Sequence, residues 1–226
     1  MSTARLNPTA TLLPDGKVLV AGGSETGCCN VIPLSSAELY DPDTAIWTLT
    51  GSMNAARYAH LAVLLSNGPL AGKVLVTGGL SDENLTIESS AELYDPSTGL
   101  WVNTGNMTIA RFWDNPSPAV LPDGSVLIVG GITSGGTNCS VEHWFNEAEL
   151  YDQVSQTWTP TSAKTTNANE TTALLPDGLM LVAGGRKGTS PTATVVADAE
   201  LFGTESDTYT NTFSDPNCNC HADADA

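Results

Sequence analysis

A pair of adjacent glycines follows a short apolar run at four places in the chain, and this recurrence constrains the fold more than any other feature. The first glycine of each pair stands at position 22, 78, 130 or 184, so the copies are spaced by 56, 52 and 54 residues. Self-similarity at a period of this size indicates tandem structural repeats. The 226-residue chain is therefore expected to contain four copies of one small unit.

Three further positions recur in step with the glycine pair. Each unit opens on a basic residue, which is Arg5, Arg57, Arg111 or, more loosely, Lys164. An Ala-Glu-Leu-aromatic block after the glycines supplies Glu38, Glu92, Glu149 and Glu200. Seven residues after the aromatic of that block stand Trp47, Trp101, Trp158 and Tyr209. Because these residues are present in every unit, we interpret them as parts of the fold and not of an active site.

Each unit reads as four short strands, and no convincing amphipathic helix is present. In three units the first two strands are joined by Pro-Asp-Gly, which is typical of a tight turn. A single four-stranded sheet with two apolar faces cannot bury them alone, whereas radial stacking buries each sheet between two neighbours. We therefore expect an all-β protein, a β-propeller of four four-stranded blades. The expected blades span about 1–53, 54–107, 108–163 and 164–213, and a Cys- and Asp-containing tail spans 214–226.

The glycine pair, the Tyr-Asp-Pro block and the tryptophan seven residues later resemble the kelch repeat over about residues 4–213. The Pro-Asp-Gly-Lys-Val-Leu-Val wording at 14–20 is most similar to kelch repeats of the galactose-oxidase-like group. The resemblance implies a propeller, although kelch propellers usually contain more than four blades. The ring is therefore expected either to close with four blades or to form part of a larger ring or assembly.

The recurring charged and aromatic residues are given structural roles. We expect the glutamates to pair with the basic residue that opens a unit, which would tie strands of adjacent blades together. Losing one partner of such a partly buried pair would be costly. The three tryptophans are expected to pack between blades.

The charge and hydropathy of the chain exclude two classes of partner. Eight basic and 25 acidic residues give a net charge of −17, which repels nucleic acid and anionic membranes. No run of 18 apolar residues could form a membrane-spanning helix, and the first residues do not form a signal peptide. The abundance of neutral polar residues is typical of secreted β proteins, so we expect an extracellular protein.

The connections between the second and third strands are long and differ in every unit. Since strand direction alternates, they should share one face with the blade-to-blade segments. Function on a repeat scaffold usually resides in such variable loops. The connection of the third unit is the candidate binding loop, and its candidate residues are Asn138, His143, Trp144 and Phe145. The alternative is that Trp144 and Phe145 fold back and cap their own blade.

No catalytic constellation is recognisable. The three histidines, His60, His143 and His221, show no ligand spacing for a copper site, and no cysteine is placed to cross-link a strand tyrosine. The three arginines that could mimic a sialidase triad occupy equivalent repeat positions, and no Gly-x-Ser-x-Gly elbow exists. We therefore predict a non-enzymatic protein without a metal or another cofactor.

Cysteines and glycosylation sequons both fall on the expected long-loop side. The cysteines are Cys28, Cys29, Cys139, Cys218 and Cys220. In an oxidising compartment a tail cysteine could reach Cys28 or Cys29 and join the last blade to the first, or the tail could be a disordered linker with free thiols. The sequons begin at Asn84, Asn106, Asn138 and Asn169, a number that chance alone would produce.

These observations predict a binding module that uses its long-loop face to contact a protein or a glycan. Two alternatives stay open. One is a structural subunit that assembles with copies of itself, and the other is a fragment of a carbohydrate-active oxidase.

Overall fold

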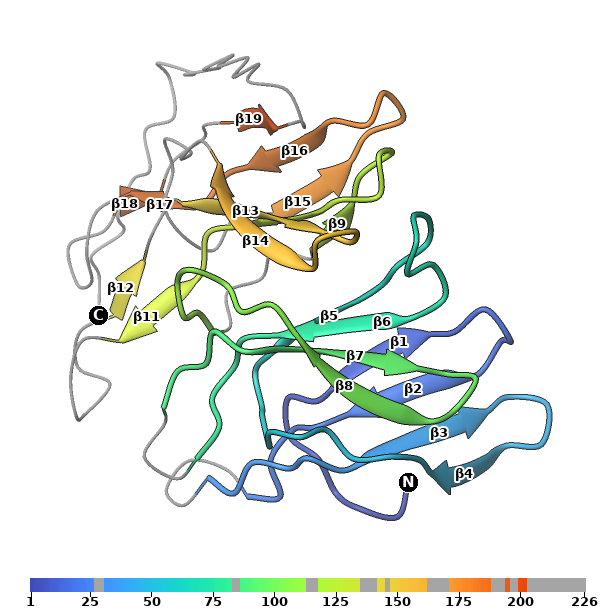
Figure 1. Cartoon of the computed structure of the whole chain (residues 1–226). Coiled ribbons are helices and arrows are strands. Elements are labelled where there is room, and N and C mark those ends of the chain that lie inside the picture. Colours follow the sequence, from blue (N-terminus) through green and yellow to red (C-terminus); the bar gives the residue numbers. More distant parts are fainter. Residues whose placement is uncertain are drawn as a thin grey trace, which may run out of the picture.

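The computed structural model describes residues 1–26, 31–82, 86–112, 118–134, 142–144, 147–161, 171–187, 194–195 and 199–202. These residues form 19 β-strands, and no helix occurs among them. The strands form four antiparallel blades that follow one another along the chain (Figure 1). The predicted all-β fold with four propeller blades is confirmed.

The strands of the four blades have the following bounds. Blade 1 contains β1 (Thr9–Leu12), β2 (Val18–Ala21), β3 (Ala37–Asp41) and β4 (Ile46–Leu49). Blade 2 contains β5 (Leu61–Leu64), β6 (Val74–Thr77), β7 (Ala91–Asp95) and β8 (Leu100–Thr104). Blade 3 contains β9 (Ala119–Val120), β10 (Val126–Val129), β13 (Ala148–Asp152) and β14 (Thr157–Thr161). Blade 4 contains β15 (Thr171–Leu174), β16 (Met180–Ala183) and β19 (Ala199–Phe202).

One blade strand is not described, and two loops carry additional strands. The fourth strand of blade 4, expected around Tyr209, lies outside the described residues. The connections between the second and third strands of blades 3 and 4 carry small hairpins. Their strands are β11 (Ile132–Ser134), β12 (Glu142–Trp144), β17 (Arg186–Lys187) and β18 (Thr194–Val195).

The same register is repeated from blade to blade. In the first three blades a tyrosine of the third strand is opposite a tryptophan of the fourth, as in the pair Tyr94 and Trp101. The rings of these pairs lie 4.9 to 5.1 Å apart between centroids, in a tilted arrangement. Such aromatic cross-strand pairs stabilise a sheet and fix its register.

The glycine pairs are required where the blades approach each other. Gly78 and Gly79 have φ values of +70° and +91°, which side-chain-bearing residues rarely adopt. A Cβ on Gly78 would lie 2.4 Å from the Arg111 carbonyl oxygen, and one on Gly79 would lie 2.7 Å from that of Tyr58. In blades 1 and 2 the glycine pair is therefore required by close contact with the backbone of the neighbouring linkers.

The hydrophobic core is divided into layers between consecutive blades. We call the side of a blade that looks toward the next blade its forward face, and the opposite side its rear face. The forward face of blade 1, with Leu19 and Ala37, packs on the rear face of blade 2, with Val74, Tyr94 and Trp101. The equivalent residues form the layers between blades 2 and 3 and between blades 3 and 4. Trp101 and Trp158 are buried in these layers, at 8% and 7% exposure.

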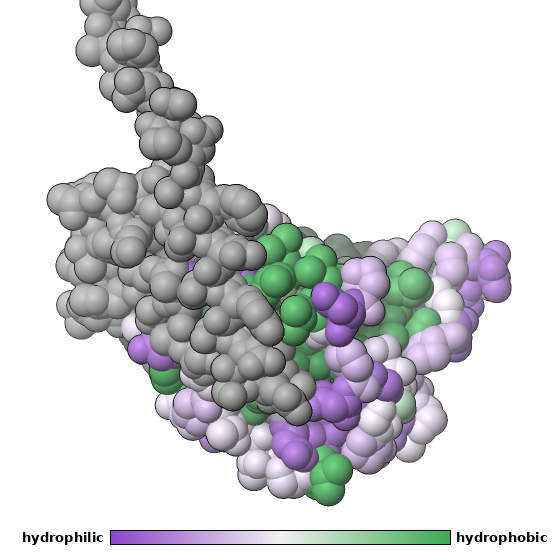
Figure 2. All heavy atoms as spheres, turned by 90° about the horizontal axis from the view of Figure 1, so that it is seen from above, coloured by the Kyte–Doolittle hydropathy of each residue, from purple (hydrophilic) through white to green (hydrophobic). Residues whose placement is uncertain are grey.

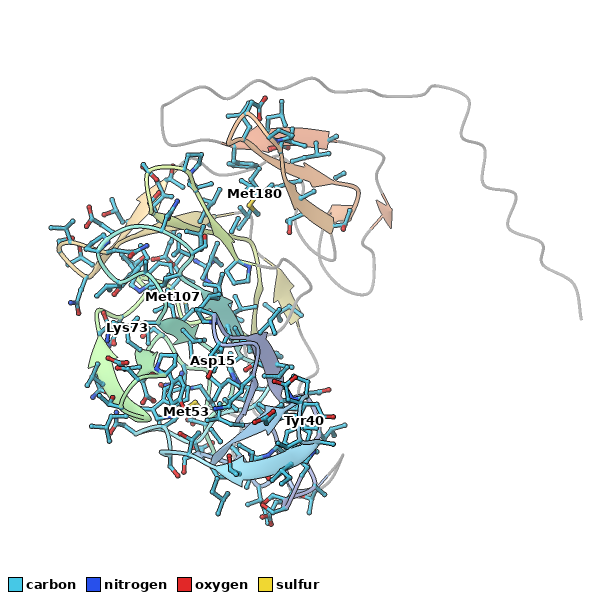
Figure 3. The ribbon with its side chains drawn as sticks, turned by 90° about the vertical axis from the view of Figure 1, so that its right-hand side faces the viewer. Asp15, Tyr40, Met53, Lys73, Met107 and Met180 are labelled. Carbon is cyan, nitrogen blue, oxygen red and sulfur yellow. The ribbon has the colours of Figure 1, made fainter. Side chains whose placement is uncertain are left out.

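The four blades form an open arc. Blade 1 and blade 4 lie at opposite ends of the molecule, with blades 2 and 3 between them (Figures 1 and 3). Trp47 is only half-buried on the rear face of blade 1, because no described blade packs against it. The expectation that Trp47 is packed between blades therefore does not hold in this arrangement, and the four blades do not close a ring.

The two sides of the arc carry different connections. The short turns that join the first strand to the second and the third strand to the fourth lie on one side, which we call the short-turn side (Figure 1). The long connections between the second and third strands and the linkers between blades lie on the other side. The hairpins β11–β12 and β17–β18 are on this second side, which we call the long-loop face. The alternating strand direction places them there.

Two departures from the repeat contact each other on the short-turn side. Unit 2 has an extended turn at 66–72, and unit 3 has Gln153 where units 1 and 2 have Pro42 and Pro96 after the third strand. The buried Gln153 side chain accepts a hydrogen bond from the Leu70 N–H at 2.9 Å and donates to the Asn67 carbonyl at 3.0 Å. The longer turn is thus held by blade 3.

Replacement of Trp101 by alanine is expected to destabilise the protein by about 3–5 kcal/mol, because a large buried side chain leaves a cavity. Trp47→Ala serves as the matched control, and its cost should be clearly smaller since that side chain is only partly buried. Urea unfolding measured by tryptophan fluorescence and circular dichroism compares the two variants. Equal losses of stability would contradict the assignment of the blade-to-blade layers.

Candidate functional site: the linkers and the long-loop face

Each linker arginine inserts its side chain into the blade that follows. The Arg57 guanidinium donates to the Gly78 carbonyl at 2.8 Å, to the Ser90 carbonyl at 3.1 Å and to Glu92 Oε1 at 3.0 Å. The Arg57 and Glu92 side chains are 0% and 1% exposed. The guanidinium therefore binds both ends of the connection that follows the glycine pair.

The other two arginines make the same contacts. Arg5 pairs with Glu38 at 3.2 Å, and Arg111 pairs with Glu149. The second oxygen of each carboxylate accepts a main-chain N–H at 2.7 Å, donated by Ser2, Asn54 or Thr108. In the fourth unit, Glu200 is buried in β19, and Lys164 lies outside the described residues.

The backbone of the linker arginine binds the preceding blade. The Arg57 N–H donates to the Leu34 carbonyl at 3.1 Å, and the Gly23 N–H donates to the Arg57 carbonyl at 3.0 Å. Arg111 is bound to Glu88 and Gly79 in the same way, at 3.2 and 2.9 Å. Main chain and side chain of one residue thus join two consecutive blades.

Burial and contacts with neighbouring groups have opposite effects on the pKa values of these charged side chains. Burial raises the pKa of Glu38, but hydrogen bonds from Ser2, Arg5 and Thr3 outweigh it and the pKa is lowered. Burial lowers the pKa of Arg111, while Glu149 opposes that change. The Glu38 carboxylate thus accepts hydrogen bonds from several groups of its own blade and linker, as a residue that holds the fold together would.

His60 occupies the joint between blades 1 and 2. It is buried, and its Nε2 lies 2.8 Å from Thr9 Oγ1. Burial and the positive charge of Arg57 lower the pKa of His60 to about 3. The imidazole is therefore neutral and structural in the folded protein.

On the long-loop face, each linker forms isolated β-bridges with the long connection of the blade that follows it. In blade 2 the bridged pairs are Tyr58 with Leu80 and Leu80 with Ile87, and in blade 3 Phe112 is bridged to Ile132. Ile132 begins the hairpin in which Trp144 pairs with Ile132 and His143 pairs with Thr133. Of the four candidate binding residues, the structure thus places His143 and Trp144 on β12. Asn138 and Phe145 lie outside the described residues.

Most of the modification sites also fall outside the described part of the chain. This holds for all five cysteines, Cys28, Cys29, Cys139, Cys218 and Cys220, and for the sequons at Asn84, Asn138 and Asn169. Asn106 is exposed in the linker before blade 3, and the Thr108 hydroxyl of its sequon donates to Glu149 Oε2 at 2.7 Å.

Two cavities were not anticipated from the sequence. One, of about 300 Å³, lies among the inner strands of blades 2 to 4 and is lined mainly by apolar residues that include Val63, Val120, Leu174 and Met180. The other, of about 430 Å³, lies on the short-turn side. It is lined by residues that include Asp15, Lys73 and Asp95, and the hydrogen bond from Lys73 lowers the pKa of Asp95 to about 2 (Figure 3). Inner-strand side chains meet only in the assembled arc, so no local pattern could have signalled the first cavity.

The described residues contain no cluster of three or more histidine, cysteine or acidic side chains able to hold a metal ion. Within the same ranges, no helix is long and apolar enough to cross a membrane.

Four-stranded antiparallel blades stacked about a common axis, with long connections at one end, define a β-propeller repeat protein. The family model described as Kelch motif matches residues 5–54 and 68–108. This match covers blade 1 and most of blade 2, and it includes the linker arginine Arg5. The chain is a kelch-repeat protein.

Several curated proteins share this similarity. An F-box/kelch-repeat protein of Arabidopsis thaliana is 30% identical over 154 residues, which are 63% of this chain and 31% of the relative. Kelch-like protein 23 of Homo sapiens is 26% identical over 157 residues, 69% of this chain and 25% of the relative. Galactose oxidase of Gibberella zeae is 35% identical over 88 residues, 39% of this chain and 11% of the relative. The chain thus spans less than a third of the length of each.

The predicted extracellular location is wrong. The relatives that match the largest share of the chain are F-box/kelch-repeat and kelch-like proteins, which are typically intracellular. The prediction rested on the neutral polar composition, which reflects a β-rich surface and does not report a compartment. The disulfide and glycosylation predictions lose the argument that depended on an oxidising, secretory environment.

Glu92→Gln is expected to destabilise the protein by about 3–5 kcal/mol, because the buried Arg57 charge is left without its counter-charge. Lys17→Ala is the control, since Lys17 and Asp15 form an exposed pair at 3.6 Å that should contribute about 0–1 kcal/mol. Urea unfolding at neutral pH measures both. A loss in Glu92→Gln no greater than that in Lys17→Ala would refute the structural role of the pair.

The neutral state of His60 predicts a dependence of stability on pH. In the unfolded chain the pKa of histidine is about 6.5, so its contribution is fully present above that pH. As pH falls below about 6.5, His60 is protonated in the unfolded chain, whereas in the folded protein its pKa of about 3 keeps it neutral. The free energy of unfolding should therefore fall by about 1.4 kcal/mol per pH unit from this residue between about pH 6 and 4.

Urea unfolding across this pH range checks the effect in wild type and in His60→Gln, which cannot titrate. The variant should be less stable at pH 7.5 but show a shallower decline as the pH is lowered. Parallel pH profiles would show that His60 is protonated in the folded protein.

Proposed function

We propose that this kelch-repeat protein is a non-catalytic protein-interaction module that binds its partner through the long-loop face. The observation that carries the proposal is the β11–β12 hairpin, which extends from a repeated framework and has no equivalent in blades 1 and 2 as described. A rigid scaffold that presents connections of different length is the usual design of a binding surface on a repeat protein.

The framework below the hairpin is suited to holding it in place. The Phe112–Ile132 bridge connects the hairpin to the linker before blade 3. Arg111, the preceding residue, is buried and binds Gly130 and Glu147 on either side of the hairpin. Fixing the two described ends of the connection reduces the part that must be ordered on binding.

Charge favours one chemical class of partner. The net charge of −17 gives the surface a negative potential that attracts basic proteins and repels acidic ones. We therefore propose a basic protein surface, and not a nucleic acid or an anionic glycan, as the partner. The names of the kelch-like and F-box/kelch-repeat relatives do not identify such a partner.

The reading as an oxidase fragment has less support. A copper site of that type needs histidine and tyrosine side chains that converge on one point. His60 is buried at the joint of blades 1 and 2, while Tyr94 and Tyr151 are buried in different layers and bonded to Thr50 and Thr104. Copper analysis of the purified protein and an assay of sugar oxidation test this alternative directly.

The interaction surface can be mapped with two matched variants. In the first, the β11–β12 hairpin between 132 and 144 is replaced by a short Gly-Ser connection. In the second, exposed residues of a short turn on the opposite side, including Val154, are replaced by serine. Binding partners captured from cells of the source species are then quantified by mass spectrometry.

Basic proteins captured by wild type should be lost with the hairpin variant and retained with the short-turn variant. Their retention by the hairpin variant, or their equal loss from both, would refute the long-loop face as the binding surface.

A further inference from the structure

The extended turn of blade 2 forms one wall of a charged cavity against blade 1. We infer that this cavity binds a free basic amino acid, with Asp15 contacting the positive side chain of the ligand and Lys73 contacting its carboxylate. The cavity lies on the short-turn side, so the inference is independent of the partner proposed for the long-loop face.

The cavity has a volume of about 430 Å³ and lies between turns of blades 1 and 2. Blade 1 contributes Pro14 and Asp15, and blade 2 contributes residues 71–73 of its extended turn and residues 95–97, where β7 ends. Figure 3 views the short-turn side, with Asp15 and Lys73 labelled on the two blades. Sites for small molecules typically have volumes of about 300–1,000 Å³, so a molecule of amino-acid size can enter this one.

Gly72 keeps the cavity open. It has a φ of +88°, and no atom lies within 4 Å of the position that a Cβ would occupy. At Gly68, near the other end of the same turn, a Cβ would lie 2.8 Å from the Gln153 side chain. One end of the extended turn is therefore packed against blade 3, whereas the other end borders open space.

The ion pair inside the cavity arises from a departure from the repeat. Lys73 stands where Lys17 stands in blade 1, but Ala71 replaces the turn aspartate, Asp15. Lys17 lies 3.6 Å from Asp15, whereas Lys73 forms its ion pair with Asp95. The Lys73 and Asp95 side chains are each 29% exposed, so this pair is more buried than the one in blade 1.

The charges of the lining define the chemistry of the ligand. Two carboxylates, of Asp15 and Asp95, and one ammonium group, of Lys73, leave the cavity with an excess of one negative charge. Lys73 carries three N–H donors and uses one for Asp95, so it can also donate to the carboxylate of a ligand. A basic amino acid carries one carboxylate and a net charge of +1, and it therefore matches both features.

Asp15 is accessible to the positive group of such a ligand. Its side chain is 51% exposed, and an exposed pair such as that with Lys17 is weak, so a ligand can replace Lys17 at little cost. Asp15 Oδ1 accepts the Lys17 N–H at 3.1 Å, which fixes the carboxylate on its turn. Groups that are ordered before binding lower the entropy cost of binding.

The apolar surface of the protein lies elsewhere. Figure 2 shows hydrophobic side chains gathered on the side seen from above, and the cavity among the inner strands is lined mainly by apolar residues. The cavity on the short-turn side combines its charges with the rings of Pro14 and Pro96. The methylene groups of a basic side chain can pack against these rings while its charged end reaches Asp15.

Titration of the ¹⁵N-labelled protein with L-arginine, followed by NMR at low ionic strength, tests the inference. We expect saturable shifts of the Gly72 and Ser97 amides, and Asp15→Asn should weaken binding by at least about tenfold. Asp123→Asn is the matched control. Asp123 occupies the same position in the Pro-Asp-Gly turn of blade 3 and accepts the Ser125 N–H at 2.9 Å, but it does not line the cavity.

A second ligand tests the role of Lys73. L-Argininamide keeps the side chain of arginine but lacks the carboxylate, so Lys73→Gln should weaken binding of L-arginine and not that of L-argininamide. Lys73→Arg, which keeps the positive charge, should retain binding of both ligands. Circular dichroism verifies that each variant is folded.

Shifts that do not saturate, or that arise only away from the cavity, would overturn the inference. Equal weakening by Asp15→Asn and Asp123→Asn would show that L-arginine responds only to the overall negative charge of the protein. Equal weakening of both ligands by Lys73→Gln would refute the contact between Lys73 and the carboxylate.

Discussion

The linker arginine is the residue on which the arrangement of the blades depends. Its main chain is bonded to the blade that precedes it, and its side chain is bonded to the blade that follows. Arg57 shows this most clearly, with Gly23 and Leu34 on one side and Gly78, Ser90 and Glu92 on the other. A rotation of one blade against the next would break several of these bonds at once.

Burying the arginine–glutamate pair costs free energy, and further hydrogen bonds to the same two groups offset that cost. A buried guanidinium and carboxylate lose their hydration, and their mutual attraction alone does not compensate well for that loss. Here the guanidinium also binds two carbonyls and the carboxylate also accepts main-chain N–H groups. The glycine pair is needed for the same reason, because any side chain at Gly22 or Gly78 would push the linker carbonyl away. The pair therefore specifies the geometry of the joint more than it adds to stability.

The repeat made the fold predictable because each of its residues has one role in every blade. Glycine pairs and glutamates recur in the same order in all four units, and the tryptophan recurs in three, so the four blades and their strand order could be deduced before the structure was seen. The partial exposure of Trp47 could not be deduced in this way, since it depends on whether another blade lies against blade 1. The contact of Gln153 with the 66–72 turn was also missed, because each departure from the repeat is uninformative until the other is placed beside it. The candidate loop was located by its length, but only its β12 portion, with His143 and Trp144, is placed by the structure.

The proposed binding surface lies apart from the residues that join the blades. The linkers and blade layers use nearly all recurring residues, whereas the hairpins of the long-loop face use residues that differ between units. If the long-loop face binds a partner as proposed, changes to its hairpins would alter binding without altering the joints between blades. The similarity to relatives with different names, from kelch-like proteins to galactose oxidase, fits such a division of roles.

Native-state hydrogen exchange of Arg57→Met tests the central claim most directly, because the claim is that one residue joins two blades. The amide of Gly23, which donates to the Arg57 carbonyl in blade 1, and those of the first residues of blade 2 should lose protection together. The amide of Gly79, which donates to the Arg111 carbonyl at the next joint, should keep more of its protection. Loss confined to blade 2, with Gly23 still protected, would show that the linker arginine stabilises only its own blade.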